Sequence, residues 1–176
     1  MSRSSFFTRE PRLDYDPWVQ REIEAFHQDA DAHWVAELSC GHQQHVRHRP
    51  PFELRPWVLS AEGRTARLGQ TLDCLLCDQR VMPEGHSAYK RTATFTESSI
   101  PNGLLRAHST KPGVWALIVV TRGALQFFEG DDNVPRHVAV PGAPAIVPAK
   151  LVHRVAPAGS VEFHVEFWSA SRSRSG

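Results

Sequence analysis

All three cysteines of this chain lie in two short clusters, and histidines stand beside the first of them. One cluster runs from Cys40 to His48 and holds three histidines, and the other is Cys74-Leu-Leu-Cys77. Thiolates and imidazoles at such spacings are the ligands that tetrahedral zinc takes in proteins. In a reducing compartment, three cysteines are better explained as metal ligands than as a disulfide with a spare thiol. The pattern therefore predicts a zinc site.

The spacing also suggests which residues bind the metal. Two intervening residues let Cys74 and Cys77 turn both sulfurs toward one ion, and Cys40 supplies a third thiolate. The candidates for the fourth ligand are the three histidines of the first cluster: His42, His45 and His48. We favour His42, because a Cys-Gly-His turn places a sulfur and an imidazole on adjacent sides of a tight loop, and His45 is the next candidate. Four protein ligands would make the zinc structural rather than catalytic.

The other half of the chain holds a second set of candidate ligands: His108, His153 and Glu166. Residues 161–168 alternate between polar and apolar, so His164 and Glu166 share one face of a strand. A polar row inside a small barrel is costly unless it binds something. Two histidines and one carboxylate on separate strands match the facial triad that holds a divalent metal with open positions. We expect a second metal there, zinc or iron, with His164 in the same pocket. The alternative is that these histidines are paired or exposed.

Two unlike segments must position these groups. Residues 20–83 contain every cysteine, whereas residues 92–168 contain the clearest strand patterns. The join at 84–91 follows Pro83 and contains Gly85, which is typical of a linker. We expect 1–18 to be a flexible arm and 169–176, which is low in complexity and basic, to be a disordered tail.

The patterns inside both segments favour β-structure. In the first, an Asp-rich turn separates the runs 23–27 and 33–38, which predicts a hairpin. Prolines interrupt the rest, so this segment buries little core and needs a metal staple. In the second, Gly- and Pro-containing turns separate seven β-branched or aromatic runs: 92–96, 114–121, 124–129, 137–140, 145–147, 152–155 and 161–168. Many short strands without a clear helix predict a sandwich or barrel.

Charge and composition exclude several classes of partner. The net charge is +1, which gives no global attraction to a polyanion such as nucleic acid. Arg47, Arg49 and Arg55, close to Phe52 and Trp57, keep a local nucleic-acid surface as an alternative. No run of eighteen apolar residues is present, so we expect no membrane span. The N-terminus has no apolar stretch of signal-peptide length, and we expect a cytoplasmic protein.

The first segment resembles a small bacterial family of unknown function. The resemblance covers most of residues 22–78 and rests on these stretches: Trp34-Val-Ala-Glu-Leu-x-Cys-Gly-His42, Gln44-His-Val-Arg-His48, Pro50-Pro-Phe, Arg55-Pro-Trp-Val58, Gly63-Arg64 and Leu72-x-Cys-x-x-Cys77. It supports a domain in this part of the chain and implies no activity.

The second segment looks like the cupin-type domain of TehB-type tellurite-resistance proteins. The matching stretches are 94–101, 104–115, 142–148, 152–155 and 165–167. The general second cupin motif also fits, with Gly142, Pro148 and His153. The first cupin motif is degraded, because Thr110 stands where a second histidine would follow His108. The resemblance implies a cupin (jelly-roll) β-barrel with His108, His153 and Glu166 as metal ligands.

Together these observations predict a mainly β protein with a zinc-stapled N-terminal module followed by a cupin-type barrel. We expect metal-dependent binding or sensing of a small molecule or oxyanion, in resistance to tellurite or oxidative stress. The first alternative is a cupin metalloenzyme with a site of two histidines and one carboxylate. The second is a zinc-ribbon adaptor for a protein or a nucleic acid. Cupins often pair through strands, so a homodimer is a further expectation.

Overall fold

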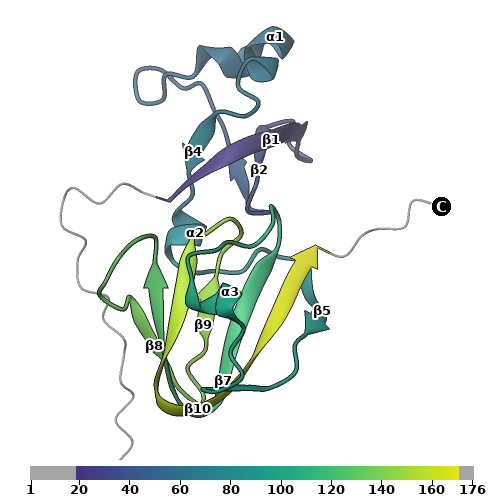
Figure 1. Cartoon of the computed structure of the whole chain (residues 1–176). Helices are drawn as coiled ribbons and strands as arrows, with labels where there is room; N and C mark the ends of the chain where they lie inside the picture. The colour runs from purple at the N-terminus through teal and green to yellow at the C-terminus, as the bar shows by residue number, and fades with distance from the viewer. Residues whose placement is uncertain (1–18, 171–176) are drawn as a thin grey trace, which may run out of the picture.

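The computed structural model describes residues 19–170, which form two antiparallel sheets (Figure 1). The first sheet has the order β3-β2-β1-β4 and consists of β1 (Gln20–Gln28), β2 (Trp34–Leu38), β3 (Gln43–His45) and β4 (Thr71–Asp73). Pairing of β1 with β2 from Ile23↔Leu38 to Gln28↔Trp34 confirms the expected hairpin.

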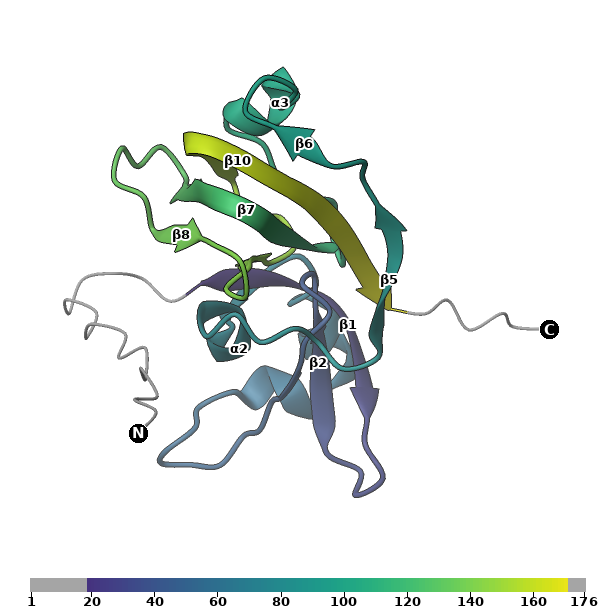
Figure 2. The ribbon, with the colours of Figure 1, turned by 90° about the horizontal axis from the view of Figure 1, so that it is seen from below.

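The second sheet is built on two long strands, β7 (Trp115–Glu129) and β10 (His153–Ala170), which run side by side in Figure 2. Short strands pair with their free edges. On β10 these are β5 (His86–Arg91) and β6 (Phe95–Thr96), and on β7 they are β8 (His137–Ala139) and β9 (Ala145–Val147). The expected mainly β class is confirmed, and a cupin-type jelly roll stays a prediction.

The helices of the described residues are single turns: η1 (Pro56–Leu59), α1 (Ala61–Thr65), α2 (Leu75–Asp78) and α3 (Asn102–Leu105). Ser60 caps α1 by accepting a hydrogen bond from the Gly63 amide at 3.0 Å. No helix in residues 19–170 has the length and apolar character needed to cross a membrane.

Four runs that we expected to be separate strands merge in pairs into β7 and β10. The turns expected around Gly123 and Gly159 are bends within these strands, and both glycines adopt positive φ, +76° and +93°. The pairing shifts register between Pro157↔Leu125 and Val161↔Gly123, so the two strands bend at the same level. Because the partners bend together, the hydrogen-bonded ladder resumes beyond the bend instead of ending there.

Other sequence expectations also change. The stretch 84–91 is not an irregular linker, because β5 (His86–Arg91) occupies most of it and pairs with β10. The sequence did not predict this strand, because β5 is almost wholly exposed and therefore lacks the alternation of polar and apolar residues that marks a half-buried strand. The first two residues of the expected tail, Ser169 and Ala170, end β10. The arm at 1–18 and the tail from 171 lie outside the described residues.

Two apolar cores hold the structure, and one of them joins the two sheets. The first core contains Ile118, Phe163 and Val165 of the second sheet. The other core combines Ile23 and the cysteines with Trp115 and Ala149 from the C-terminal half. In Figure 1, α2 lies at the junction between the two sheets. The N-terminal part therefore completes its core with side chains of the second sheet.

Replacing Gly123 with alanine tests the bend of the long strands. A Cβ atom at Gly123 would lie 2.0 Å from the Ser160 carbonyl oxygen, whereas one at Gly130, which also has positive φ, would meet nothing within 4 Å. We expect Gly130→Ala to cost about 1–2 kcal/mol through its backbone conformation alone. Gly123→Ala should cost about 3 kcal/mol or more. Urea unfolding of both variants measures the difference, and equal costs would contradict the close approach of β7 and β10.

Candidate metal centre and ligand pocket

Four buried side chains from distant parts of the chain meet in one cluster: Cys40, His42, Cys74 and Cys77. Their ligand atoms all lie within 4.8 Å of one another. His42 Nδ1 is 3.5 Å from Cys40 Sγ, 3.3 Å from Cys74 Sγ and 3.6 Å from Cys77 Sγ. One imidazole nitrogen thus faces all three sulfurs.

Two tight turns bring these ligands together. Cys40 and His42 follow β2 in a turn closed by hydrogen bonds from the Gly41 amide to Leu38 O and from the Leu38 amide to His42 O. Gly41 adopts φ of +91°, which a side chain would disfavour. Cys74 is the N-cap of α2 and Cys77 lies within it, so one helical turn places both sulfurs on the same side.

The electrostatics of the cluster favour a thiolate at Cys74 and a charged imidazole at His42. The hydrogen bond with Cys40 holds the pKa of Cys74 well below the ordinary thiol value, and the same bond raises the pKa of Cys40. Burial opposes a charged imidazole, but hydrogen bonds to Cys74 and Cys77 outweigh it and raise the pKa of His42 to about 9. Arg21, itself buried, donates from Nε to Cys77 Sγ at 3.4 Å and adds positive charge.

This donor set fits a structural metal such as zinc. Three thiolates and one imidazole fill a tetrahedron and leave no position for water or substrate. All four residues are buried, which matches a closed site. Sequence reasoning did not find Arg21, because nothing in the pattern of β1 marks an arginine that lies beside a sulfur 56 positions away.

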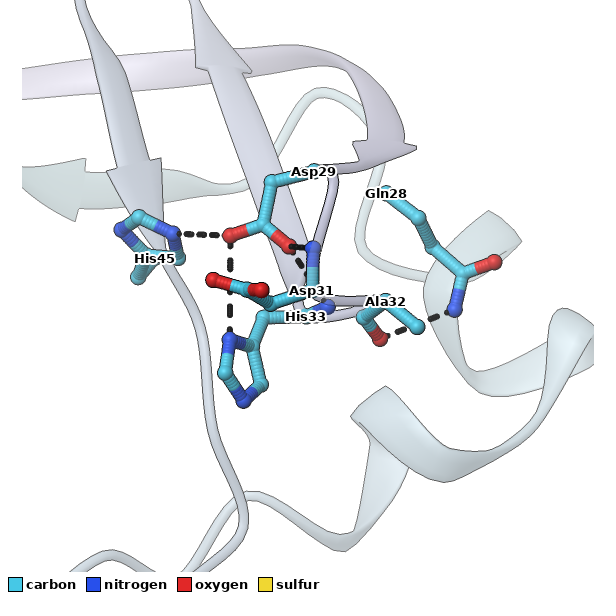
Figure 3. Close-up of polar contacts among 6 residues, drawn as sticks. All are labelled: Gln28, Asp29, Asp31, Ala32, His33 and His45. Atoms are coloured by element: carbon cyan, nitrogen blue, oxygen red, sulfur yellow. Dashed lines mark hydrogen bonds and ion pairs between the residues drawn. The ribbon is translucent and has the colours of Figure 1, made fainter.

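The remaining histidines of the motif have other partners. His45 Nε2 lies 2.7 Å from Asp29 Oδ2 on the exposed hairpin, with His33 Nδ1 at 3.7 Å from the same oxygen (Figure 3). The hydrogen bond from His45 lowers the pKa of Asp29 to about 2. His48 Nδ1 accepts from the Arg55 amide at 3.1 Å. Of the three candidate histidines, the structure brings only His42 to the sulfurs.

Trp115, at the start of β7, joins the metal cluster to the second sheet. Its indole Nε1 donates to Cys40 O at 2.7 Å, and its ring meets His42 edge-on with centroids 5.4 Å apart. The Gly113 amide donates to Ser39 O at 2.9 Å. Arg80, three residues after Cys77, forms an ion pair with Glu129 at the end of β7. Sequence reasoning gave Trp115 and Arg80 no role, because both act across the two halves.

His108 and His153 also meet, at a pocket of about 460 Å³ in the second sheet. Their backbones form an antiparallel bridge, and their ring centroids are 4.1 Å apart. Each Nδ1 lies 2.9 Å from the carbonyl two residues before it, Arg106 O or Leu151 O. Burial lowers the pKa of His153 to about 4, so this imidazole is neutral at pH 7.

Glu166 and His164 do not join that pair, which corrects the expected triad. The pocket is lined from β10 by Phe163, Val165 and Phe167, so the alternating Glu166 and His164 lie on the opposite face of the strand. There His164 Nε2 is 3.5 Å from Glu166 Oε1, and its Nδ1 accepts from Arg91 at 3.3 Å. In residues 19–170 no third His, Cys, Asp or Glu completes a metal group with His108 and His153. The donor set therefore does not fit the expected cupin metal.

Each half of the chain matches a known family of protein domains. Residues 25–81 match a family described as a protein of unknown function (DUF3565), and residues 90–165 match the TehB-like domain. The chain contains a DUF3565 domain followed by a TehB-like domain, as the two resemblances predicted. No curated protein matches its sequence significantly.

Two solved structures show likeness to the chain. A protein from E. coli (strain K12) is 22% identical with a TM-score of 0.46, over 51% of this chain and 96% of that one. TehB from Haemophilus influenzae is 24% identical with a TM-score of 0.45, over 49% of this chain. The match covers 32% of the TehB chain, so this protein spans about a third of that length.

Two single substitutions separate the ligand histidine from its neighbour. His42→Ala should lower zinc affinity by more than about a hundredfold, because loss of an outer-sphere partner alone costs 10–100-fold. His45→Ala should keep one zinc per chain, since His45 is bound to Asp29 on the hairpin surface. Competition with a chromophoric chelator measures both affinities. Equal loss of zinc in the two variants would contradict the assignment of His42.

Proposed function

We propose that this chain is a zinc-stapled protein whose TehB-like domain binds a small anionic molecule. One observation carries the proposal: a pocket of about 460 Å³ brings His108 and His153 together with Lys90 and Lys111. Sites for organic ligands typically have volumes of roughly 300–1,000 Å³, apolar walls and a few placed polar groups. The pocket has all three properties.

The zinc in this proposal is structural. Cys40, His42, Cys74 and Cys77 would hold it in the N-terminal domain, whose core is completed by side chains of the second sheet. A metal bound by such a set can contribute on the order of 10 kcal/mol to folding. Contacts from Cys40 and His42 to Trp115 would make this staple support β7, one wall of the pocket.

We also propose a cupin-type fold for the binding domain. The two long bent strands with short strands on both edges support a cupin-type jelly roll around the pocket. A role in resistance to tellurite or oxidative stress, by binding or sensing a small molecule, is supported by the TehB-like match alone. We further propose a cytoplasmic protein that forms a homodimer through an exposed edge strand such as β5.

The test follows the two imidazoles during titration of the zinc-loaded full chain with small anions, tellurite and carboxylates included. By NMR, the side-chain signals of His108 and His153 should shift with a saturating dependence on concentration. The signal of His27, which bonds Glu37 on the first sheet, should not move and serves as the control. A Lys90→Met, Lys111→Met double variant, which removes the positive charge at the pocket, should weaken the binding. If no anion moves the two signals, the proposed function is wrong.

A further inference from the structure

The size of the pocket favours an organic ligand over a bare oxyanion. Its volume of about 460 Å³ exceeds that of an anion with three oxygens, which displaces only a few waters at about 30 Å³ each. Such an anion would leave most of the space filled with water. A ligand that fills the pocket needs a body of several carbon atoms.

The walls of the pocket are apolar along both long strands. Ala116 and Ile118 of β7 face it together with Phe163, Val165 and Phe167 of β10. Water against these side chains is released when an apolar body takes its place, and this release favours binding. Inorganic oxyanions have no surface that could make use of such walls.

Positive charge lies with two exposed lysines that line the pocket, Lys90 and Lys111. The Lys90 ammonium lies 6.0 Å from the centre of the Phe167 ring, where charge and apolar wall meet. None of the pocket-lining residues described is acidic, so no carboxylate of the site competes for these cations. Because both lysines are exposed, an anionic group that pairs with them at the pocket edge would stay in contact with water.

The histidine pair provides polar atoms to the pocket, and His153 carries no charge at pH 7. Carbonyl oxygens only accept, so the bonds to Arg106 O and Leu151 O require a proton on each Nδ1. The other nitrogen of the neutral His153 ring is then an acceptor, which repels an anionic oxygen and suits a hydroxyl or amide donor. Recognition of negative charge is left to Lys90 and Lys111.

We infer that the ligand of this pocket is an amphipathic monocarboxylic acid. Its apolar body packs between β7 and β10, against Ile118, Phe163 and Val165, and its carboxylate meets Lys90 and Lys111 at the edge. This inference rests on the proposed function and narrows it from small anions in general to one chemical class.

Isothermal titration of the zinc-loaded full chain with butanoate, hexanoate and octanoate tests the inference. Each added methylene should strengthen binding about fourfold, as expected for burial of one CH₂ group, until the pocket is full. Replacing both lysines, Lys90→Met with Lys111→Met, should weaken octanoate binding about tenfold. Both are exposed, so the variant should fold normally. Arg122→Met is the matched control, because Arg122 is 68% exposed, pairs with Glu162 and does not line the pocket.

Three further probes separate the outcomes. 1-Octanol, which has the body without the charge, should bind more weakly than octanoate and be unaffected by the lysine variant. Tellurite and sulfate, which have charge without the body, should bind at least tenfold more weakly than octanoate. If either inorganic anion binds as tightly as octanoate, or chain length has no effect, the inference fails while the proposed function stands. If no probe binds at all, both fail.

Discussion

The structure depends on the contact between a buried metal cluster and one tryptophan of the neighbouring sheet. Trp115 donates its indole proton to Cys40 O at 2.7 Å and covers the His42 ring with its edge. It is fully buried, in the core that holds all three cysteines. The turn that carries two of the four candidate ligands is therefore fixed from outside its own domain. Neither half of the chain completes this core by itself.

This constraint links the metal cluster to the ligand pocket over a short stretch of chain. Gly113 and Trp115 contact Ser39 and Cys40, whereas Val114 and Ala116 between and beside them line the pocket. A second connection leaves α2 through Arg80, whose partner Glu129 stands opposite His153 in the β7–β10 ladder. Binding of a metal by the cysteines should thus hold one wall of the pocket in place. The cluster would contribute to ligand binding without touching a ligand.

Sequence patterns indicated the metal cluster well, because its chemistry is local. The Cys74-x-x-Cys77 spacing and the Cys-Gly-His turn bring donors together within a few residues, and both lie in the cluster. The Cys-Gly-His turn already favoured His42 over His45. The partner that holds His45 elsewhere, Asp29 in the hairpin turn, lies outside the motif. Contacts across the two halves, such as those of Arg21 and Trp115, leave no periodic signal.

The error at Glu166 has a different physical cause. Alternation along β10 identified which residues share a face, but not which face lines the pocket. His164 is only 5% exposed, so both faces of the strand are covered there, and the usual rule that polar residues face water does not decide. The bends of β7 and β10 were misassigned as turns for a related reason. A glycine with positive φ can stand in a turn between two strands or in a bend within one strand. Only the pairing of β7 with β10 shows that these are bends.

Through Trp115, the metal cluster and the second sheet should form one cooperative unit. Hydrogen exchange of the backbone amides, with metal bound and after its removal by a chelator, tests this most directly. Removal should lower protection in β1 and β2 and also in the first half of β7, near Trp115. Full protection of β7 in a protein whose first sheet has lost its own would contradict it.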